Sequence, residues 1–397
     1  MPSTPSPQRA REIAAAAQAG DVVVARAPGS VELLGESCTA TGGMLLTAAL
    51  PVDAAVAVAV TDSGNLVVRD GEEIHEMPMP DAPVHGLPPT ATAVADAVAA
   101  LQNAVHLAPP AGRGIDVSVA CDIPADRGLG ELPAIQSALA VALNSLWGDR
   151  DDVPVRTRIA AALHEAACER AGAPLPPHPW TVSLRSTGDA VIVHNHADGA
   201  VRQIPYPAHL GLVLAWSPDV TAATPPTARP SFFADACQAF GVETLDRLPD
   251  ADDRVLEWLS ARLELAAESG DGSADIPTAG RAAGWLDDAS GCSDRARAVS
   301  GHLRHGDVSS AIRSVGVDVR MRETVPADGT PMHGPAAAAA EAGAAVRCCQ
   351  HPAAALVAWA MADDAADVAA ALASAGAATL PLEGARPAAL DGPCAGE

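Results

Sequence analysis

The sequence predicts an α+β fold, in which strands gather in the first half of the chain and helices in the second. Up to Trp216, short apolar segments bounded by Gly and Pro predominate, and longer amphipathic segments follow them. No Gly-x-Gly-x-x-Gly motif follows the first predicted strand. The pattern therefore disfavours a dinucleotide-binding domain, in which strands and helices alternate regularly.

The first half is predicted to begin with a helix over Pro7–Ala19, which Gly20 ends. A turn is expected at Pro28-Gly29, after the first strand. The predicted strands are Asp21–Ala27, Leu45–Val60 in two pieces around Pro51, Gly64–Val68, Glu73–Met77, Gly114–Cys121, Val191–His196, Val201–Pro205 and Leu210–Trp216. The predicted helices among them are Ala91–Val105, Pro133–Leu146 and Thr157–Ala171.

A Pro- and Thr-rich loop, Ser217–Pro230, separates this half from the helix-rich half. One strand is predicted there, at Ala354–Met361, and the region after Leu380 is predicted to be irregular. The predicted helices are Ser231–Phe240, Asp253–Ser269, Ile276–Ala289, Arg295–His305, Val308–Val315, Ala336–Ala345 and Asp364–Ala375.

Composition excludes several classes of function. Lys and Arg number 25 and Asp plus Glu number 49 among 397 residues, which gives a formal net charge of -24. This charge repels phosphate backbones and anionic lipid, so neither a nucleic acid nor a membrane is an expected partner. Every Lys/Arg cation is an arginine. The absence of lysine excludes mechanisms that need a phosphate-binding or Schiff-base lysine.

The cysteines and the N-terminal segment predict a cytoplasmic protein. Eight cysteines are scattered along the chain without a Cys-x-x-Cys pair, so we expect reduced thiols rather than a disulfide scaffold. Residues 1–11 lack a signal-peptide pattern. The longest apolar run, Met44–Val60, is interrupted by Pro51 and Asp53 and is too short to span a bilayer.

The first segment that contains candidate functional residues is Ala27–Leu50. Glu36 lies next to Gly35 and is followed by small polar residues, and Gly42 and Gly43 predict a tight turn. A carboxylate in this setting is suited to accepting hydrogen bonds from a polyol. The residues alone equally fit a solvated carboxylate on a hairpin.

The second segment is Asp122–Leu146. Here a strand leads through Gly128, Leu129 and Gly130 into a helix that carries Glu131 in its first turn. A glycine loop at a helix N-terminus is the geometry that cradles an anion. An ordinary strand-to-helix turn has the same pattern, so both interpretations stay open.

Histidines supply two weaker candidates. His178 lies between Pro177 and Pro179, and we expect a surface-turn residue there rather than a base. His194 and His196 share one strand face, but no third ligand is visible, so an exposed strand face is expected and no metal site is predicted.

Together the two segments resemble the galactokinases of the GHMP kinase family. The first resembles the galactokinase signature and keeps Ala27-Pro28-Gly29, an apolar strand, Gly35-Glu36 and Gly42-Gly43. The second resembles the family's Gly-Leu-Ser-Ser-Ser-Ala phosphate loop and keeps Gly128, Leu129 and Ala134. The resemblance implies a two-domain α+β fold, with an N-terminal domain over residues 1–205 that carries the sugar and phosphate loops. The C-terminal domain is then expected over residues 206–397.

The chain departs from the family at its chemical positions. Ser30 stands where the resemblance places an Arg that stabilises the transferred phosphoryl group, and Pro179 falls near the position of the catalytic Asp. Residues 37–41 replace a His-Thr-Asp-Tyr-Asn run, and Gly130-Glu131-Leu132 replaces the three serines of the phosphate loop. The late glycine-rich motif becomes residues 348–354, CCQHPAA.

The resemblance and its departures predict a catalytically degenerate galactokinase-like protein with a binding or regulatory role. A surviving sugar site would consist of Glu36 with Gly35, Gly42 and Gly43, and a nucleotide site of residues 128–131. The alternative is an active ATP-dependent sugar 1-kinase with a rebuilt site, in which Glu131 or Asp126 binds Mg²⁺ or His178 acts as base. We expect ATP and Mg²⁺ to bind weakly or not at all. A small sugar or nucleotide is the expected kind of ligand, and the sequence identifies no protein partner.

Overall fold

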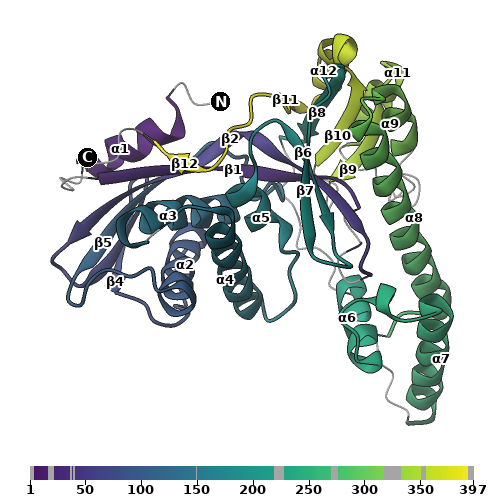
Figure 1. Cartoon of the computed structure of the whole chain (residues 1–397), viewed down its shortest axis with the longest axis horizontal. Coiled ribbons are helices and arrows are strands. Elements are labelled where there is room, and N and C mark those ends of the chain that lie inside the picture. Colours follow the sequence, from purple (N-terminus) through teal and green to yellow (C-terminus); the bar gives the residue numbers. More distant parts are fainter. Residues whose placement is uncertain are drawn as a thin grey trace. The chain divides into compact units, whose positions relative to one another are not determined.

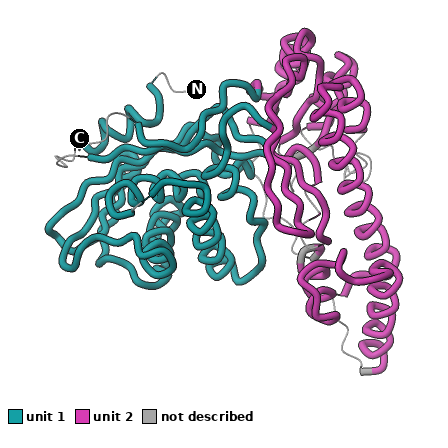
Figure 2. Tube along the Cα trace, in the orientation of Figure 1, with its two compact units in different colours: residues 1–31, 48–190, 382–397 teal, residues 32–47, 191–381 magenta. Residues whose placement is uncertain are grey.

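The computed structural model describes residues 4–16, 22–35, 38, 41–148, 150–218, 228–269, 276–316, 332–349 and 355–391. The chain forms two compact units, which Figure 2 distinguishes by colour. Unit 1 consists of residues 1–31, 48–190 and 382–397, and unit 2 of residues 32–47 and 191–381. The division into folding domains at residue 205 stays a prediction.

The main sheet of unit 1 follows the order β12-β1-β2-β5-β3-β4. Parallel pairing joins β3 to β5, and antiparallel pairing joins β2 to β5, β3 to β4 and β1 to β12. The strands are β1 (Val22–Leu34), β2 (Met44–Thr61), β3 (Asn65–Asp70), β4 (Glu73–Pro78), β5 (Gly114–Cys121) and β12 (Ala389–Leu390). The ends of β1 and β2 that belong to residues 32–47 are part of unit 2.

Helices cover both faces of this sheet (Figure 1). One face carries α2 (Pro89–Val105), α3 (Glu131–Trp147), α4 (Val153–Ala171) and α5 (His178–Arg185). On the other face, α1 (Ser6–Ala16) buries Ala10 and Ala14 against the alanines of β2 and β5. Small side chains at these positions allow the helix backbone to approach the sheet closely.

Unit 2 contains an antiparallel sheet in the order β11-β8-β10-β9. Its strands are β8 (Leu210–Trp216), β9 (Ala345–Cys349), β10 (Ala355–Met361) and β11 (Ala378–Pro381). On one face, α11 (His333–Glu341) and α12 (Ala365–Ser374) bury an aliphatic core, and α12 follows the short 3₁₀ helix η2 (Ala362–Asp364). The hairpin of β6 (Ala190–Asn195) and β7 (Ala200–Pro205) pairs with β2.

The rest of unit 2 is helical. It comprises α6 (Ala228–Phe240), the 3₁₀ helix η1 (Leu245–Arg247), α7 (Ala251–Ser269), α8 (Ala279–Arg304) and α9 (Val308–Val315). Phe232 lies at the centre of its aromatic core, with its ring centroid 5.7 Å from that of Trp285 and 6.2 Å from that of Trp258. Among the described helices, none is long and apolar enough to cross a bilayer.

Two predicted breaks in strands were wrong. The turn expected at Pro28-Gly29 is absent, because β1 runs through both residues, and β2 likewise continues through Pro51. At Gly29, a Cβ atom would lie 2.7 Å from the Leu129 carbonyl oxygen and 2.8 Å from a methyl group of Leu50. The glycine therefore permits a close approach of another chain segment rather than a turn.

Other differences concern individual helices and strands along the chain. The helices expected over Ile276–Ala289 and Arg295–His305 form one helix, α8, whose buried residues Ala289 and Cys292 continue the apolar stripe across the expected gap. Residues 382–388 are irregular as predicted, but Ala389–Leu390 form β12, which pairs with β1. Helix α5 and strands β9 and β11 were not predicted, and β9 begins at Ala345, the last residue of a predicted helix. Elements β5, β8 and α9 have the predicted bounds.

Candidate functional site

Three segments of unit 1 that are distant in sequence meet at the glycine loop. The backbone N–H of Ser30, in β1, donates a hydrogen bond of 2.9 Å to the carbonyl oxygen of Leu129. The hydroxyl of Ser183, in α5, donates a hydrogen bond of 2.8 Å to the carbonyl oxygen of Pro28. Both contacts hold β1 between the loop and α5, so the region around Ser30 is the candidate phosphate side of a site.

The loop conformation depends on its glycines. Gly128 and Gly130 have φ angles of 68° and 72°, and Gly130 is the N-cap of α3. A Cβ atom at Gly130 would lie 2.5 Å from the Ser30 hydroxyl oxygen. Leu129 is 1% exposed and fixes the loop to the core. This part of the loop keeps a helix N-terminus without a capping side chain at its N-cap, where backbone N–H groups are available to an anion.

Glu131 brings a carboxylate to this helix N-terminus. Burial raises the pKa of Glu131, and the nearby Asp126 carboxylate raises it further. A hydrogen bond from the Asp126 backbone opposes these effects and connects Glu131 back to the loop. The electrostatic environment of the loop is therefore unfavourable for a second negative group.

Pro179 lies in α5, a helix that is firmly anchored in unit 1. The indole N–H of Trp180 donates a 2.6 Å hydrogen bond to Gln136 of α3, and the Gln136 amide donates one of 3.1 Å to the Ala93 carbonyl oxygen. His178 is 2% exposed, so the expectation of a surface-turn residue was wrong. The prolines stand at the start of the helix, where the missing N–H costs no intrahelical bond.

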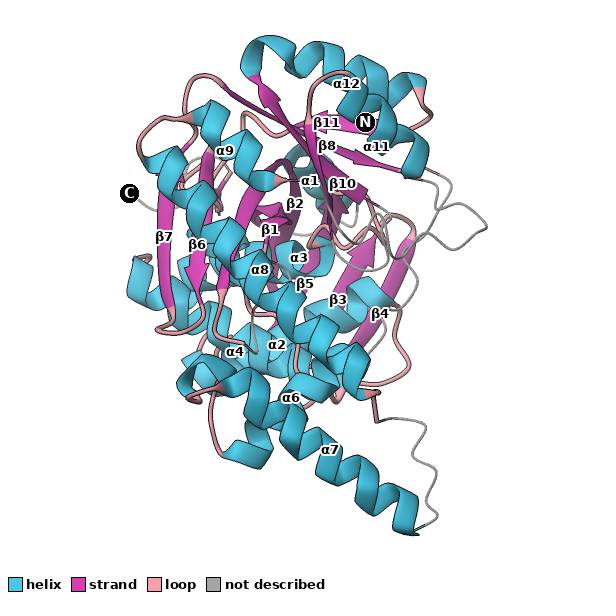
Figure 3. Ribbon diagram, turned by 90° about the vertical axis from the view of Figure 1, so that its right-hand side faces the viewer, coloured by secondary structure: helices cyan, strands magenta, loops and turns pink. Residues whose placement is uncertain are grey.

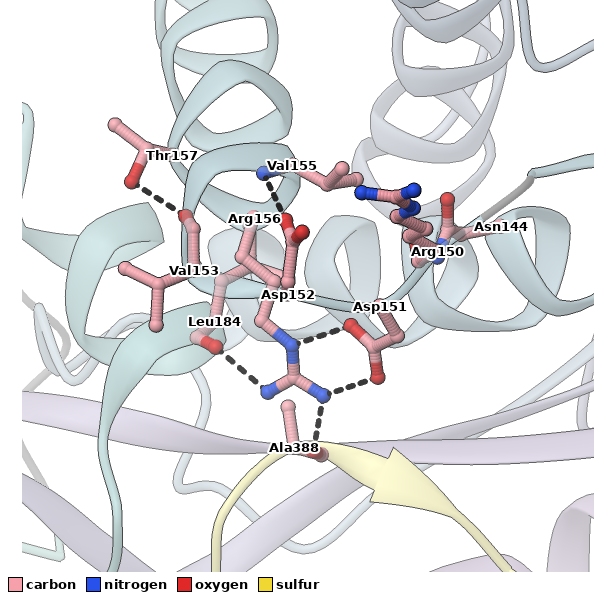
Figure 4. A network of polar contacts seen from close by, with 10 residues as sticks. All are labelled: Asn144, Arg150, Asp151, Asp152, Val153, Val155, Arg156, Thr157, Leu184 and Ala388. Atoms are coloured by element: carbon pink, nitrogen blue, oxygen red, sulfur yellow. Dashed lines mark hydrogen bonds and ion pairs between the residues drawn. The ribbon is translucent and has the colours of Figure 1, made fainter.

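Arg156 fixes the other end of α5 (Figure 4). Its guanidinium makes two hydrogen bonds, of 2.6 and 2.7 Å, to the Asp151 carboxylate. The same group donates bonds of 2.8 Å to the Leu184 carbonyl oxygen and 3.1 Å to that of Ala388. It thereby joins α4, the end of α5 and the C-terminal strand region. Sequence analysis missed this residue, because its partners lie 28 and 232 positions away along the chain.

The glycines of the predicted sugar segment lie in unit 2. Gly35 has a φ of 93°, and a Cβ atom there would overlap the Met44 carbonyl oxygen. A Cβ atom at Gly42 would overlap the Asp246 carboxylate, and one at Gly43 would lie 2.6 Å from the Cβ of Cys38. Glu36, the predicted sugar ligand, lies outside the described residues. The described glycines are thus sites of close chain approach.

The two strand histidines are not on an exposed face, contrary to expectation. His194 is 5% exposed, and its Nε2 lies 2.9 Å from the Thr47 hydroxyl. His196 stacks on it with a centroid distance of 6.4 Å, and burial lowers the pKa of His196. In the part of the chain that the structure describes, no three His, Cys, Asp or Glu side chains gather as a metal site would require.

Comparison with known proteins bears directly on these segments. Residues 14–60 match the family model of the galactokinase galactose-binding signature. No curated protein sequence matches the chain.

Solved structures resemble the chain over nearly its whole length. The structure of Lactococcus lactis galactokinase complexed with galactose has a TM-score of 0.74 at 13% identity, covering 96% of this chain and 98% of that one. Methanococcus jannaschii mevalonate kinase has a TM-score of 0.57 at 9% identity, covering 94% and 99%. Homoserine kinase from Cytophaga hutchinsonii has a TM-score of 0.56 at 15% identity, covering 94% and 98%.

The predicted two-domain α+β fold is confirmed, because a galactokinase, a mevalonate kinase and a homoserine kinase share it with this chain over nearly its whole length. Residues 14–60 match a signature of galactokinase. The chain therefore shares the fold of these kinases and resembles galactokinase over that segment.

Proposed function

We propose that this chain binds a hexose in a galactokinase-like site and lacks efficient phosphoryl transfer, so that its role is binding or regulation. The observation that carries the proposal is the pair of Ser30 and Pro179, at the positions where the resemblance expects an Arg and a catalytic Asp. Ser30 is 3% exposed against the glycine loop, and Pro179 lies in the first turn of α5. Neither side chain supplies a positive charge or accepts a proton.

The size of the expected loss follows from the chemistry of phosphoryl transfer. General base catalysis contributes about 10²- to 10⁴-fold to a rate, and an arginine on the transferred group about 10³- to 10⁵-fold. Because phosphoryl transfer depends on positioning and charge stabilisation, loss of both groups removes most of what the protein supplies. Glu131 adds a carboxylate where the resemblance expects a serine.

A coupled assay for ADP release with galactose, ATP and Mg²⁺ tests the catalytic part of the proposal. We expect no turnover above the uncatalysed background, with Lactococcus lactis galactokinase as the positive control for the assay. Turnover near about one per second, an ordinary rate for kinases, would contradict the proposal.

The sugar-binding part rests on the signature match over residues 14–60 and on Gly35, Gly42 and Gly43, which stand around Glu36 as the resemblance expects. Calorimetry should detect weak galactose binding, and Glu36→Ala should abolish it. Glu243→Ala is the matched control, since Glu243 lies in unit 2 with its side chain 83% exposed. A parent protein that binds no hexose would exclude the sugar site.

One observation favours the second candidate, an active ATP-dependent sugar 1-kinase. Gly128 and Gly130 keep positive φ angles at the N-terminus of α3, a conformation compatible with phosphate binding. In that case Mg²⁺ would bind at Glu131 or Asp126. A rise in melting temperature with ATP and Mg²⁺ distinguishes the candidates, because the degenerate form should show little or none.

A further inference from the structure

A cavity of about 540 Å³ lies entirely within unit 2, and its lining includes none of the residues proposed above as sugar or nucleotide ligands. The hairpin of β6 and β7 forms one wall, and the C-terminal end of α8 forms the other. Figure 3 shows this hairpin beside α8 and α9. Its volume falls within the range of about 300–1,000 Å³ that is typical of small-molecule sites.

Two arginines give the cavity its charge. Arg202 comes from β7 and Arg304 is the last residue of α8. Neither guanidinium has a carboxylate partner among the described residues, unlike Arg69 and Arg170, which bind Asp116 and Asp96. The described residues that line the cavity include no Asp or Glu, although the whole chain contains 49 of them. Two uncompensated positive charges in so acidic a chain favour an anionic ligand.

Two nearby features oppose an anion, and both are weaker than the arginines. Because α8 ends at Arg304, its partial negative charge of about half a unit lies at this end, against two full positive charges. Asp307 is the nearest carboxylate in sequence, but it accepts a hydrogen bond of 3.0 Å from the Ser310 N–H and caps α9. The net electrostatic effect on an anion in the cavity therefore remains favourable.

The remaining lining is largely apolar. Val193, Ile204, Leu303 and Met44 contribute side chains from four elements, and the amide of Asn195 adds a polar group. A small inorganic anion would leave these apolar walls without a partner. A ligand with both a negative head and a hydrocarbon body satisfies the arginines and the walls together.

We propose that this cavity is a binding site for an amphipathic organic anion, namely an aliphatic carboxylate whose head binds Arg202 and Arg304. The hydrocarbon part packs against Val193, Ile204 and Leu303. Met44 also lines the cavity and directly follows Gly43 of the sugar segment. The site is independent of the proposed sugar binding, because none of its lining residues belongs to that site.

Calorimetry with octanoate tests the charge requirement, with 1-octanol as the uncharged probe of the same chain length. We expect octanoate to bind at least about tenfold more tightly, as loss of a charge-assisted contact predicts. The double substitution Arg202→Ala with Arg304→Ala should raise the Kd for octanoate at least about tenfold, and Arg→Lys at both positions should restore part of the affinity. Arg297→Ala is the matched control, since Arg297 lies on the same helix and pairs with Asp294 outside the cavity.

The location is tested by NMR of ¹³C-methyl-labelled methionine. Octanoate should shift the Met44 methyl resonance, identified by its loss in Met44→Leu, and leave that of Met332, which is buried in the α11/α12 core, unchanged. Equal binding by the parent and the double arginine variant would overturn the proposal. Equal affinity for octanol, or an unshifted Met44 signal, would overturn it as well.

Discussion

Two glycine-rich segments carry the resemblance to galactokinase. Both contain glycines with positive φ angles, but the structural setting of these glycines differs. In the Gly128–Gly130 loop, the glycines shape a helix N-terminus, and Ser30 packs against the loop from β1. In the segment from Gly35 to Gly43, they make room for neighbouring chain, a carbonyl oxygen at Gly35 and side chains at Gly42 and Gly43. The difference teaches that a glycine motif persists for backbone geometry even where the accompanying chemical side chains have changed.

The largest expected effect concerns the space that Gly35 provides. Gly35→Ala combines a positive φ, which costs about 1–2 kcal/mol for a side-chain residue, with overlap of the Met44 backbone. We expect the free energy of unfolding to fall by about 3 kcal/mol, measured from the urea midpoint. Gly42→Ala should cost less, because the obstructing Asp246 side chain is exposed and can move. An equal loss of unfolding free energy in Gly35→Ala and Gly42→Ala would contradict the expected difference between these two positions.

A second effect tests how firmly α5 is held beside the loop. Arg156→Ala removes the hydrogen bonds to the Leu184 and Ala388 carbonyl oxygens and should lower the free energy of unfolding by about 2 kcal/mol. Arg158→Ala, on the same helix and exposed, should change it by less than about 0.5 kcal/mol. Urea unfolding followed by tryptophan fluorescence gives both values. A similar loss in the two variants would mean that the network in Figure 4 contributes little.

A third prediction concerns the affinity of the Gly128–Gly130 loop for nucleotide. Glu131→Ser combined with Leu132→Ser removes the carboxylate at the α3 N-terminus and should tighten nucleotide binding about tenfold, equivalent to about 1.4 kcal/mol. A fluorescent ATP analogue titrated with Mg²⁺ measures the change. Glu165→Ser, on an exposed position of α4, is the control and should leave the affinity unchanged. Micromolar affinity in the parent protein would contradict the inhibitory role of Glu131.

The smallest effect is a pH dependence. Burial raises the pKa of Glu131, so the folded protein retains that proton to higher pH than the unfolded chain does. The resulting stability is present at low pH and is lost as the pH rises through the folded pKa. Glu131→Gln should therefore gain stability relative to the parent as the pH rises toward neutral, by at most about 1 kcal/mol because the group is partly exposed.

Melting temperatures of the parent and of Glu131→Gln, measured from acidic to neutral pH, check the prediction. Glu165→Gln is the control. A stability difference between Glu131→Gln and the parent that does not vary with pH would show that the Glu131 carboxyl titrates alike in the folded and unfolded chain.

Local sequence patterns were sufficient where an element is defined by its own residues. The alternation of β5 and the short apolar run of β8 predicted the bounds of these strands, and α9 also has its predicted bounds. Pro28 and Pro51 were misleading, since a strand tolerates Pro where the pairing does not need its N–H. Strand β12 has only two residues, and its existence depends on β1, more than 300 positions earlier.

The candidate site was predictable only in its backbone. The sequence located Gly128–Gly130 at a helix N-terminus, because a glycine loop between strand and helix has a local signature. It did not reveal that His178 is buried, since Pro177 and Pro179 fit a surface turn as well as a helix start. The contact between Ser30 and Leu129 of the loop joins residues 99 positions apart and needed the tertiary structure.

The return of residues 382–391 to unit 1 has a consequence for synthesis of the chain. Asp53 is 2% exposed and forms ion pairs with both Arg26 and Arg386, while Ala25 and Arg26 of β1 pair with Leu390 and Ala389. As the chain emerges from the ribosome, this edge of β1 stays open, and Asp53 lacks one of its two arginines until all of unit 2 has been made. An open edge strand is a template for pairing with other chains, so we expect the nascent protein to be more prone to aggregation before β12 pairs with β1.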